Sequence, residues 1–123
     1  MPSALRLLAA CPLLLVPFVA HADPSGEAVF KRNCAICHST EPGHNRIGPS
    51  LAGVVGRHAG AVPNFHYSSA NRNSGIVWTT EKLDAYLANP QGVLPGTAML
   101  FGGVKNDADR HALIDYLASL PPS

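Results

Sequence analysis

The stretch that most constrains this chain is Cys34-Ala35-Ile36-Cys37-His38. Two cysteines separated by two residues and followed at once by histidine form the attachment signature of a c-type haem. Residues three apart lie on one face of a helical turn, so both sulfurs can reach the two vinyl groups along one porphyrin edge. His38 then follows closely enough to place its imidazole under the iron as the proximal ligand. The motif therefore predicts one haem c, attached covalently through Cys34 and Cys37.

The same cysteine pair also fits a redox disulfide or half of a zinc site. Zinc needs two more ligands at suitable spacing, and the sequence has no second Cys-x-x-Cys pair. A thioredoxin-like protein carries its motif within a βαβ pattern, and none is visible around Cys34. A haem-free thiol–disulfide oxidoreductase stays open as an alternative, and it predicts a colourless protein.

The first 22 residues differ in character from the rest of the chain. Arg6 is the only charge before His21, residues 7–19 are apolar, and Ala20-His21-Ala22 has the small-x-small pattern of a signal-peptidase site. These features predict a secretory signal cleaved after Ala22. The apolar run is too short to span a bilayer. We therefore expect export to the periplasm of a single domain formed by residues 23–123.

Length and charge limit the possible functions of this domain. The 123 residues and formal net charge of +1 indicate one small domain without the basic footprint of a nucleic-acid or membrane-surface protein. Loss of Arg6 lowers Lys+Arg from 9 to 8, which equals the 8 Asp+Glu, so the mature domain is formally neutral. Loss of Cys11 leaves no cysteine outside the motif, which suits an oxidising compartment. We expect a monomer without stable membrane insertion.

Capping residues and apolar spacing predict three main helices. The first follows Asp23 or Ser25 and runs to about Asn33, and the second opens at Thr79 or Thr80 and ends before Pro90. The third starts after Asn106 and stops at Pro121-Pro122. Their expected inward residues are Val29, Phe30, Leu83, Tyr86, Leu87, Leu113, Tyr116, Leu117 and Leu120.

Residues 39–62 are rich in glycine and proline and predict a long loop. Such a loop is unusual in a compact domain, but a cofactor can replace the missing core. Its expected inward contacts are Ile47, Leu51, Val54 and Val55. A short helix capped by Ser68 and a helical turn ending near Leu94 complete the prediction. The fold class is all-α, with three main helices, short helical turns and long loops wrapped around one covalent haem.

The sixth position on the iron needs a ligand. Met99 is the only methionine left after the signal, and it follows Pro95-Gly96-Thr97 in a turn rather than lying in an apolar helical stripe. A thioether is a soft, neutral ligand that raises the reduction potential of haem iron. A histidine or an open site stays possible. The histidines in question are His44, His58, His66 and His111.

Across residues 25–121 the sequence resembles the class I cytochromes c, in particular mitochondrial cytochrome c and bacterial cytochrome c2. The resemblance rests on the order and spacing of several short stretches in addition to the haem motif. They are Gly26 with Phe30, Gly48-Pro49-Ser50-Leu51, Gly56-Arg57, Tyr67-Ser68-Ser69-Ala70-Asn71, Gly75-Ile76-Val77-Trp78, Tyr86-Leu87-Ala88-Asn89-Pro90, Pro95-Gly96-Thr97-Ala98-Met99 and Tyr116-Leu117.

The resemblance implies roles for residues around the haem. The Pro49 carbonyl would accept a hydrogen bond from His38 and fix its orientation, as partners of metal-bound histidines do. Three side chains would surround a buried haem propionate, which is costly unless donors satisfy it: Arg57, Tyr67 and Trp78. Three others would form a polar network beside Met99: Asn71, Tyr86 and Thr97.

The resemblance implies further contacts. Phe101 would cover the exposed haem edge. Gly26 and Phe30 would cross Leu113 and Tyr116 where the first and last helices meet.

The sequence departs from this family in its charge. Mitochondrial-type members carry lysines around the exposed haem edge, and the matching positions here are Asn33, Gln91, Gly92 and Ala98. The mature chain has only three lysines, which are Lys31, Lys82 and Lys105. We expect association with redox partners to be less steered by charge and less sensitive to salt. The sequence does not identify those partners.

These features together predict a periplasmic, monohaem, His/Met-ligated electron carrier rather than an enzyme, because a saturated iron has no place for substrate. Two alternatives stay open. One is a dedicated electron-accepting subunit of a periplasmic dehydrogenase or oxidase. The other is an open-site haem protein with peroxidase or gas-binding activity, which requires a weakly held Met99.

Overall fold

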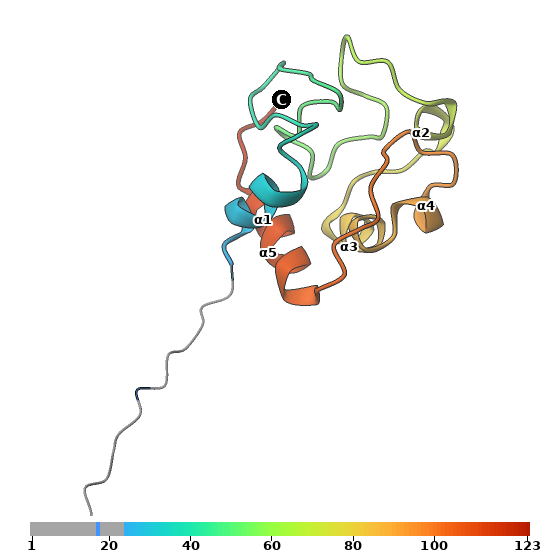
Figure 1. Cartoon of the computed structure of the whole chain (residues 1–123). Coiled ribbons are helices and arrows are strands. Elements are labelled where there is room, and N and C mark those ends of the chain that lie inside the picture. Colours follow the sequence, from blue (N-terminus) through green and yellow to red (C-terminus); the bar gives the residue numbers. More distant parts are fainter. Residues whose placement is uncertain (1–16, 18–23) are drawn as a thin grey trace, which may run out of the picture.

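The structure is a computed structural model that describes residue 17 and residues 24–123. The predicted cleavage after Ala22 and the alternative cap Asp23 lie outside these residues. Five helices follow in chain order, all within residues 26–118. Figure 1 shows them in two groups, with α1 and α5 together and α2, α3 and α4 on the other side of the molecule. The helices are α1 (Gly26–Asn33), α2 (Ser69–Asn73), α3 (Thr80–Ala88), α4 (Pro90–Val93) and α5 (Asp107–Ala118).

Side-chain caps set where these helices begin. The Ser25 hydroxyl accepts from the Ala28 N–H at the start of α1, and Ser68 caps α2. Thr79 caps α3 and Asn106 caps α5 in the same way. Each cap satisfies an N–H group that the first turn of a helix leaves unpaired. The predicted three main helices with short helical turns are confirmed.

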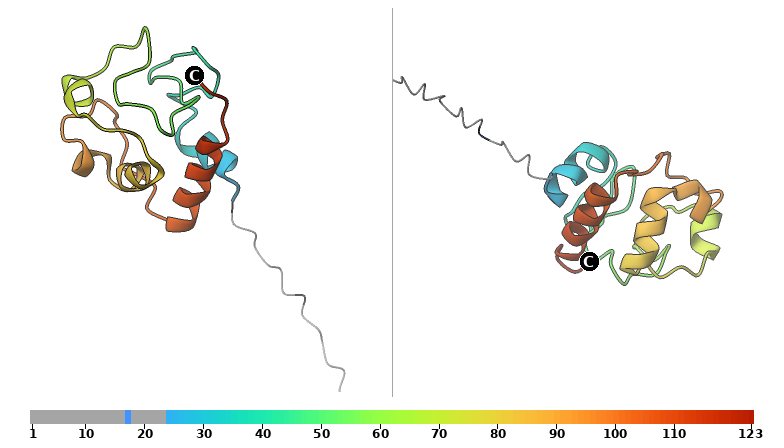
Figure 2. Two further views of the ribbon diagram at one scale, coloured as in Figure 1. Left: turned by 180° about the vertical axis from the view of Figure 1, so that it is seen from behind. Right: turned by 90° about the horizontal axis from the view of Figure 1, so that it is seen from below.

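The crossing of α1 and α5 depends on one glycine. A Cβ atom at Gly26 would lie 2.0 Å from the Ala112 carbonyl oxygen, so only a residue without a side chain lets the backbones approach this closely. The Phe30 and Tyr116 rings pack beside this contact with centroids 5.7 Å apart. Arg32 adds an ion pair to Asp109, 3.1 Å away. The right-hand view of Figure 2 shows α1 lying across α5.

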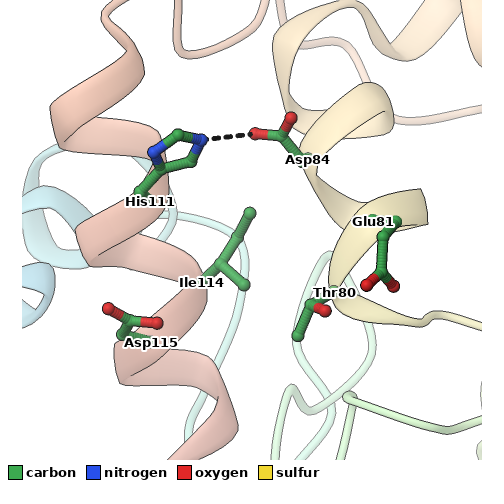
Figure 3. Close-up of a pocket in the computed structure, with 6 residues that line it drawn as sticks. All are labelled: Thr80, Glu81, Asp84, His111, Ile114 and Asp115. Atoms are coloured by element: carbon green, nitrogen blue, oxygen red, sulfur yellow. Dashed lines mark ion pairs between the residues drawn. The ribbon is translucent and has the colours of Figure 1, made fainter.

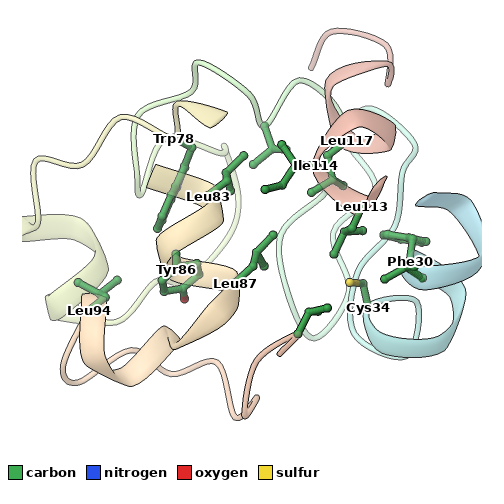
Figure 4. Packing of buried hydrophobic residues seen from close by; sticks show 13 residues of the cluster. Phe30, Cys34, Trp78, Leu83, Tyr86, Leu87, Leu94, Leu113, Ile114 and Leu117 are labelled. Atoms are coloured by element: carbon green, nitrogen blue, oxygen red, sulfur yellow. The ribbon is translucent and has the colours of Figure 1, made fainter. Parts of the chain in front are cut away.

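Apolar side chains from both helix groups form one core. Figure 4 shows Phe30, Cys34 and Leu113 packed in one part of it, with Trp78 and Tyr86 in the other. Leu113 is fully buried. The inward positions predicted for α3 are buried as expected, and Tyr116 and Leu120 are partly buried against the core.

The long loop after the haem motif differs from its prediction at one residue. Val54 is buried, and Leu51 and Val55 pack partly against the core, as predicted. The prediction that Ile47 points inward is wrong, because its side chain is 76% exposed. A loop has no fixed side-chain period, so hydrophobicity alone does not tell which face of the chain a residue takes.

Within residues 24–123 no β-strand forms, and an isolated antiparallel bridge joins His58 to Val77. The all-α prediction is therefore confirmed for the described part of the chain. No helix there is long and apolar enough to cross a membrane.

Candidate haem site

The two motif cysteines lie on a tight turn directly after α1. The Cys34 N–H donates to the Phe30 carbonyl at 2.7 Å, and the Cys37 and His38 N–H groups both donate to the Cys34 carbonyl, at 3.1 and 2.9 Å. Cys34 is buried, Cys37 is half-buried, and both thiols are free. Burial, followed by the neighbouring Cys37, raises the pKa of the Cys34 thiol to about 11. Cys34 is thus a protonated thiol, unlike the low-pKa nucleophile of a thiol oxidoreductase.

The His38 ring is held by a backbone carbonyl. Its Nδ1 lies 2.7 Å from the Pro49 oxygen, which can only accept, so Nδ1 carries the proton and Nε2 keeps a free lone pair. Burial lowers the pKa of His38, the Pro49 hydrogen bond opposes this shift, and the Arg57 charge adds to it. A neutral imidazole with an oriented Nε2 is the form that binds a metal.

Gly48 allows this arrangement. A Cβ atom there would lie 2.2 Å from Cε1 of His38 and 2.6 Å from its Nδ1, so the ring rests directly on the glycine backbone. The Gly48 N–H also donates to the Cys37 carbonyl at 2.8 Å, which ties the loop to the motif. In the sequence, Gly48 stands out only as one of the loop glycines and as part of the family resemblance. The pair Gly48-Pro49 was the only sequence signal. The need for glycine comes from the contact with the His38 ring, which only the folded structure shows.

Thr97 organises the chain around Met99. Its hydroxyl forms a hydrogen bond with the Tyr86 hydroxyl at 3.0 Å and accepts from the Met99 N–H at 3.4 Å. Gln91 donates to the Thr97 carbonyl at 3.4 Å. Burial raises the pKa of Tyr86, and the bond to Thr97 opposes that shift. Two of the three residues expected in the polar network beside Met99 are therefore joined directly.

Asn71, the third expected member, has a buried side-chain oxygen that lacks a hydrogen-bond partner within the described residues. The preceding residue, Ala70, lies beside the turn that leads to Met99, because a Cβ at Gly96 would be 3.3 Å from the Cβ of Ala70. An unpaired buried amide oxygen costs free energy and is rare in native proteins. Its position marks a place where a further polar group would fit, which agrees with a cofactor or water on the Met99 side.

The expected propionate donors lie on three separate loop segments. They are Arg57, Tyr67 and Trp78. The backbone N–H of Trp78 donates to the backbone carbonyl of Arg57 at 2.9 Å. Burial lowers the pKa of Arg57, and the Tyr67 phenol works against that shift. All three are buried or half-buried.

These donors also have bonds within the protein. Arg57 uses Nη1 to donate to the Ser50 and Ala52 carbonyls, at 2.9 and 3.1 Å. The Tyr67 hydroxyl accepts from the Val62 N–H at 3.2 Å, so its own proton is available to donate. A carboxylate placed among these groups would find donors that the loops already hold in position.

The alternative histidine ligands lie at the surface. His44, His58, His66 and His111 are all exposed. His111 lies 3.4 Å from Asp84 across a pocket of about 350 Å³ between α3 and α5 (Figure 3). This pocket is lined by charged and polar side chains with Ile114 and is separate from the motif residues. Met99, in contrast, is partly buried against the core.

A small helical domain with two free cysteines on one turn and an oriented neutral histidine beside them belongs to the class of c-type haem proteins. The family model described as "Cytochrome c" matches residues 25–121. Similar proteins include "Cytochrome c type-1" of Ascaris suum, 48% identical over 83% of this chain and 92% of that protein. "Cytochrome c2" of Blastochloris viridis is 46% identical over 84% of this chain and 81% of its own length. "Cytochrome c2 iso-2" of Magnetospirillum fulvum is 52% identical over 71% and 91%.

This chain belongs to the cytochrome c family. It is an electron-transfer protein rather than an enzyme, and it acts with redox partners. Its cofactor is one haem c, attached through Cys34 and Cys37 of the Cys-x-x-Cys-His motif.

Proposed function

We propose that this cytochrome is exported and carries single electrons with His38 and Met99 as the two iron ligands. The observation that supports this best is the neutral His38 ring, which donates to Pro49 through Nδ1 and keeps Nε2 free beside two free cysteines. Bound haem iron supplies a one-electron ferric–ferrous couple. The thiols of Cys34 and Cys37 would hold the ring permanently.

The remaining site residues would orient and shield the haem. Thr97 fixes the backbone of Met99 through its hydroxyl, so the thioether is held by a hydrogen-bonded turn. Arg57, Tyr67 and Trp78 would donate to a haem carboxylate and keep it ionised within the fold. Asn71 would pair its free oxygen with a polar group on the Met99 side.

An iron bound by both His38 and Met99 would have no position left for a substrate, which suits an electron carrier. Electron transfer needs little movement of the protein, and the hydrogen bonds of His38 to the Pro49 carbonyl and of Tyr86 to Thr97 restrict such movement. Within residues 24–123 no group of three or more His, Cys, Asp or Glu could hold a separate metal ion.

The visible spectrum of the exported protein tests the ligands. We expect sharp reduced bands of c type after dithionite and the weak long-wavelength ferric band of a sulfur–iron bond. Met99→Ala should remove that ferric band, whereas His66→Ala, at an exposed position, should leave it unchanged. A haem spectrum without the sulfur band in the unaltered protein would contradict Met99 ligation and favour the open-site alternative.

The mass of the intact exported chain tests its processing. We expect a product that starts at Asp23 and carries one haem. A product that retains residues 1–22 would contradict the proposed signal peptide.

A further inference from the structure

The peptide bond between Pro49 and Ser50 has a hydrogen-bond partner at each end. Its carbonyl oxygen, on Pro49, lies 2.7 Å from Nδ1 of His38. Its N–H group, on Ser50, donates to the side-chain oxygen Oδ1 of Asn45 at 3.0 Å. These groups therefore form one chain of hydrogen bonds, which runs from the Asn45 amide through the backbone to the His38 ring.

The Asn45 amide is oriented by a second bond. Its Nδ2 group donates to the Pro63 carbonyl at 3.0 Å. A backbone N–H can only donate and a carbonyl can only accept, so the two partners fix which end of the amide is oxygen and which is nitrogen. The half-buried side chain thus presents its oxygen to Ser50 and joins the loop after the haem motif to the loop that contains Pro63.

Ser50 is also held by contacts that do not involve Asn45. It is only 2% exposed, and its hydroxyl donates to the Glu41 carbonyl at 2.6 Å and accepts from the Ala52 N–H at 3.2 Å. Its carbonyl accepts from the Arg57 guanidinium at 2.9 Å. The specific contribution of Asn45 is therefore the acceptor for the Ser50 N–H.

An acceptor at the N–H end of a peptide bond polarises the C=O end. Hydrogen bonds arranged in series strengthen one another by about 10–30% per bond. A carbonyl that accepts more strongly from Nδ1–H makes a metal-bound imidazole more basic. A more basic axial ligand stabilises ferric iron more than ferrous iron, and hydrogen bonding around the ligands is one of the ways in which a protein sets the potential of haem iron.

We propose that Asn45 is a positioning residue that strengthens the His38 ligand through the Pro49–Ser50 peptide bond and lowers the reduction potential of the haem. This inference rests on the proposed function, because it requires His38 to bind the iron. Asn45 acts on the ring only through the polarised backbone. A side chain without an oxygen at position 45 removes the acceptor of the Ser50 N–H and weakens the bond from His38 to Pro49.

Asn45→Ala and Ser50→Ala are a matched pair of variants of the holoprotein. Both remove side-chain hydrogen bonds from the same loop, but only Asn45→Ala removes the acceptor of the Ser50 N–H. The readouts are the NMR resonance of the His38 Nδ1–H in the ferrous protein and the ferrous-to-ferric ratio at a fixed applied potential. Both readouts follow the strength of the His38 hydrogen bond, and a loss of stability alone does not change them.

We expect Asn45→Ala to move the Nδ1–H resonance upfield and to raise the ferrous-to-ferric ratio about threefold, because a weaker bond favours ferrous iron. Ser50→Ala should lower the free energy of unfolding and leave both readouts unchanged. Asn45→Asp keeps an oxygen for the Ser50 N–H but has no donor for the Pro63 carbonyl. Its Nδ1–H resonance should stay in place or move downfield, which tests the proposal even where the alanine variant does not fold.

The outcomes separate this inference from the proposed function. Equal shifts in Asn45→Ala and Ser50→Ala, no shift in Asn45→Ala, or an upfield shift in Asn45→Asp would overturn the role of Asn45 and leave the proposed function intact. Failure of the proposed function has a different signature, in the unaltered ferrous protein. The ring current of a haem moves the protons of an axial imidazole far upfield, so His38 ring protons at ordinary positions would contradict His38 ligation itself.

Discussion

At the scale of single residues, the absence of a side chain at Gly48 matters as much as the presence of His38. The imidazole rests on the Gly48 backbone, and its Nδ1–H donates to the next residue, Pro49. The backbone of two adjacent residues, Gly48 and Pro49, therefore sets the orientation of the ring. The histidine could not keep both the hydrogen bond and its place on the loop if any side chain intervened.

Replacement of Gly48 should therefore disturb the site. Gly48→Ala places a Cβ within 2.2 Å of the His38 ring, so either the ring or the loop must move. We expect the free energy of unfolding to fall by about 1–3 kcal/mol, the usual cost of overpacking. Chemical denaturation of the holoprotein measures this loss. Gly102→Ala is the control, because no heavy atom lies within 4 Å of its added Cβ, and an equal loss in both variants would contradict the contact argument.

Glu81 gives a pH-dependent prediction at the same scale. Its own backbone N–H, followed by the hydroxyls of Thr80 and Thr79, holds the pKa of this carboxyl below its ordinary value. The charged form is favoured in the folded state, so its stabilising effect is present above the ordinary pKa and is lost as pH falls through the lowered one. Carbon-detected NMR titration should show Thr80→Val raising the pKa of Glu81 and Thr80→Ser leaving it low. An unchanged pKa in the valine variant would contradict a role for the hydroxyl.

At the scale of helices, Arg110 of α5 is the main polar connection to α3. Its side chain is only 9% exposed, and its three nitrogens donate in three directions. Nε donates to Asp84 of α3 at 2.7 Å, Nη2 to Asp107 at 2.8 Å, and Nη1 to the Val104 carbonyl at 3.0 Å. A planar guanidinium carries its N–H donors on three nitrogens and reaches all three acceptors, whereas an ammonium carries its three donors on one nitrogen.

Arg110→Lys should consequently be destabilising although it conserves charge. We expect the free energy of unfolding to fall by about 2–3 kcal/mol, because at least one buried acceptor loses its donor. Thermal unfolding followed by circular dichroism provides the measurement. Arg32→Lys is the matched control, since the exposed Arg32 makes one ion pair, to Asp109, that lysine can also form. Similar losses in the two variants would show that the three-way arrangement has no special value.

Helix positions could be predicted from the sequence, but contacts between segments could not. Ser25, Ser68, Thr79 and Asn106 are local signals, since each caps a helix that begins at the next residue. Arg110 was not predicted to be buried, because only Asp107 is a partner on its own helix, whereas Asp84 comes from α3 and the Val104 carbonyl from the loop before α5. Charged residues at such positions look like solvent-facing ones until the fold is known.

The candidate site divides in the same way. The haem attachment residues follow from a spacing of a few residues and were identified directly. The contact of Gly48 with His38 and the unpaired oxygen of Asn71 depend on distances across the fold. The outward position of Ile47 was missed for a related reason, because a loop residue takes its orientation from neighbours that the sequence does not specify.

At the scale of the whole molecule, buried hydrophobic residues are distributed unevenly along the described chain. The segment between α1 and α2 contains no helix, and its buried hydrophobic residues after Cys34 are few: Ala52, Val54, Val62 and Tyr67. Ordering so long a segment costs much conformational entropy, and these few buried side chains offer little burial to oppose that cost. A covalent haem attached at Cys34 and Cys37 would supply further apolar surface for the chain to pack against. Folding and haem attachment should therefore be coupled.

Removal of the haem tests this coupling. Cys34→Ser/Cys37→Ser, which cannot form either thioether bond, should show reduced helical circular dichroism and no cooperative thermal transition. The α1–α5 contact at Gly26 is formed by the chain alone, but α3 packs on a region that the haem would complete. Cys37→Ser is the control, because Cys34 can still form one bond and the variant should bind haem and unfold cooperatively. A sharp transition in the haem-free double variant would mean that the polypeptide core is sufficient for folding. The haem would then be needed for function but not for the fold.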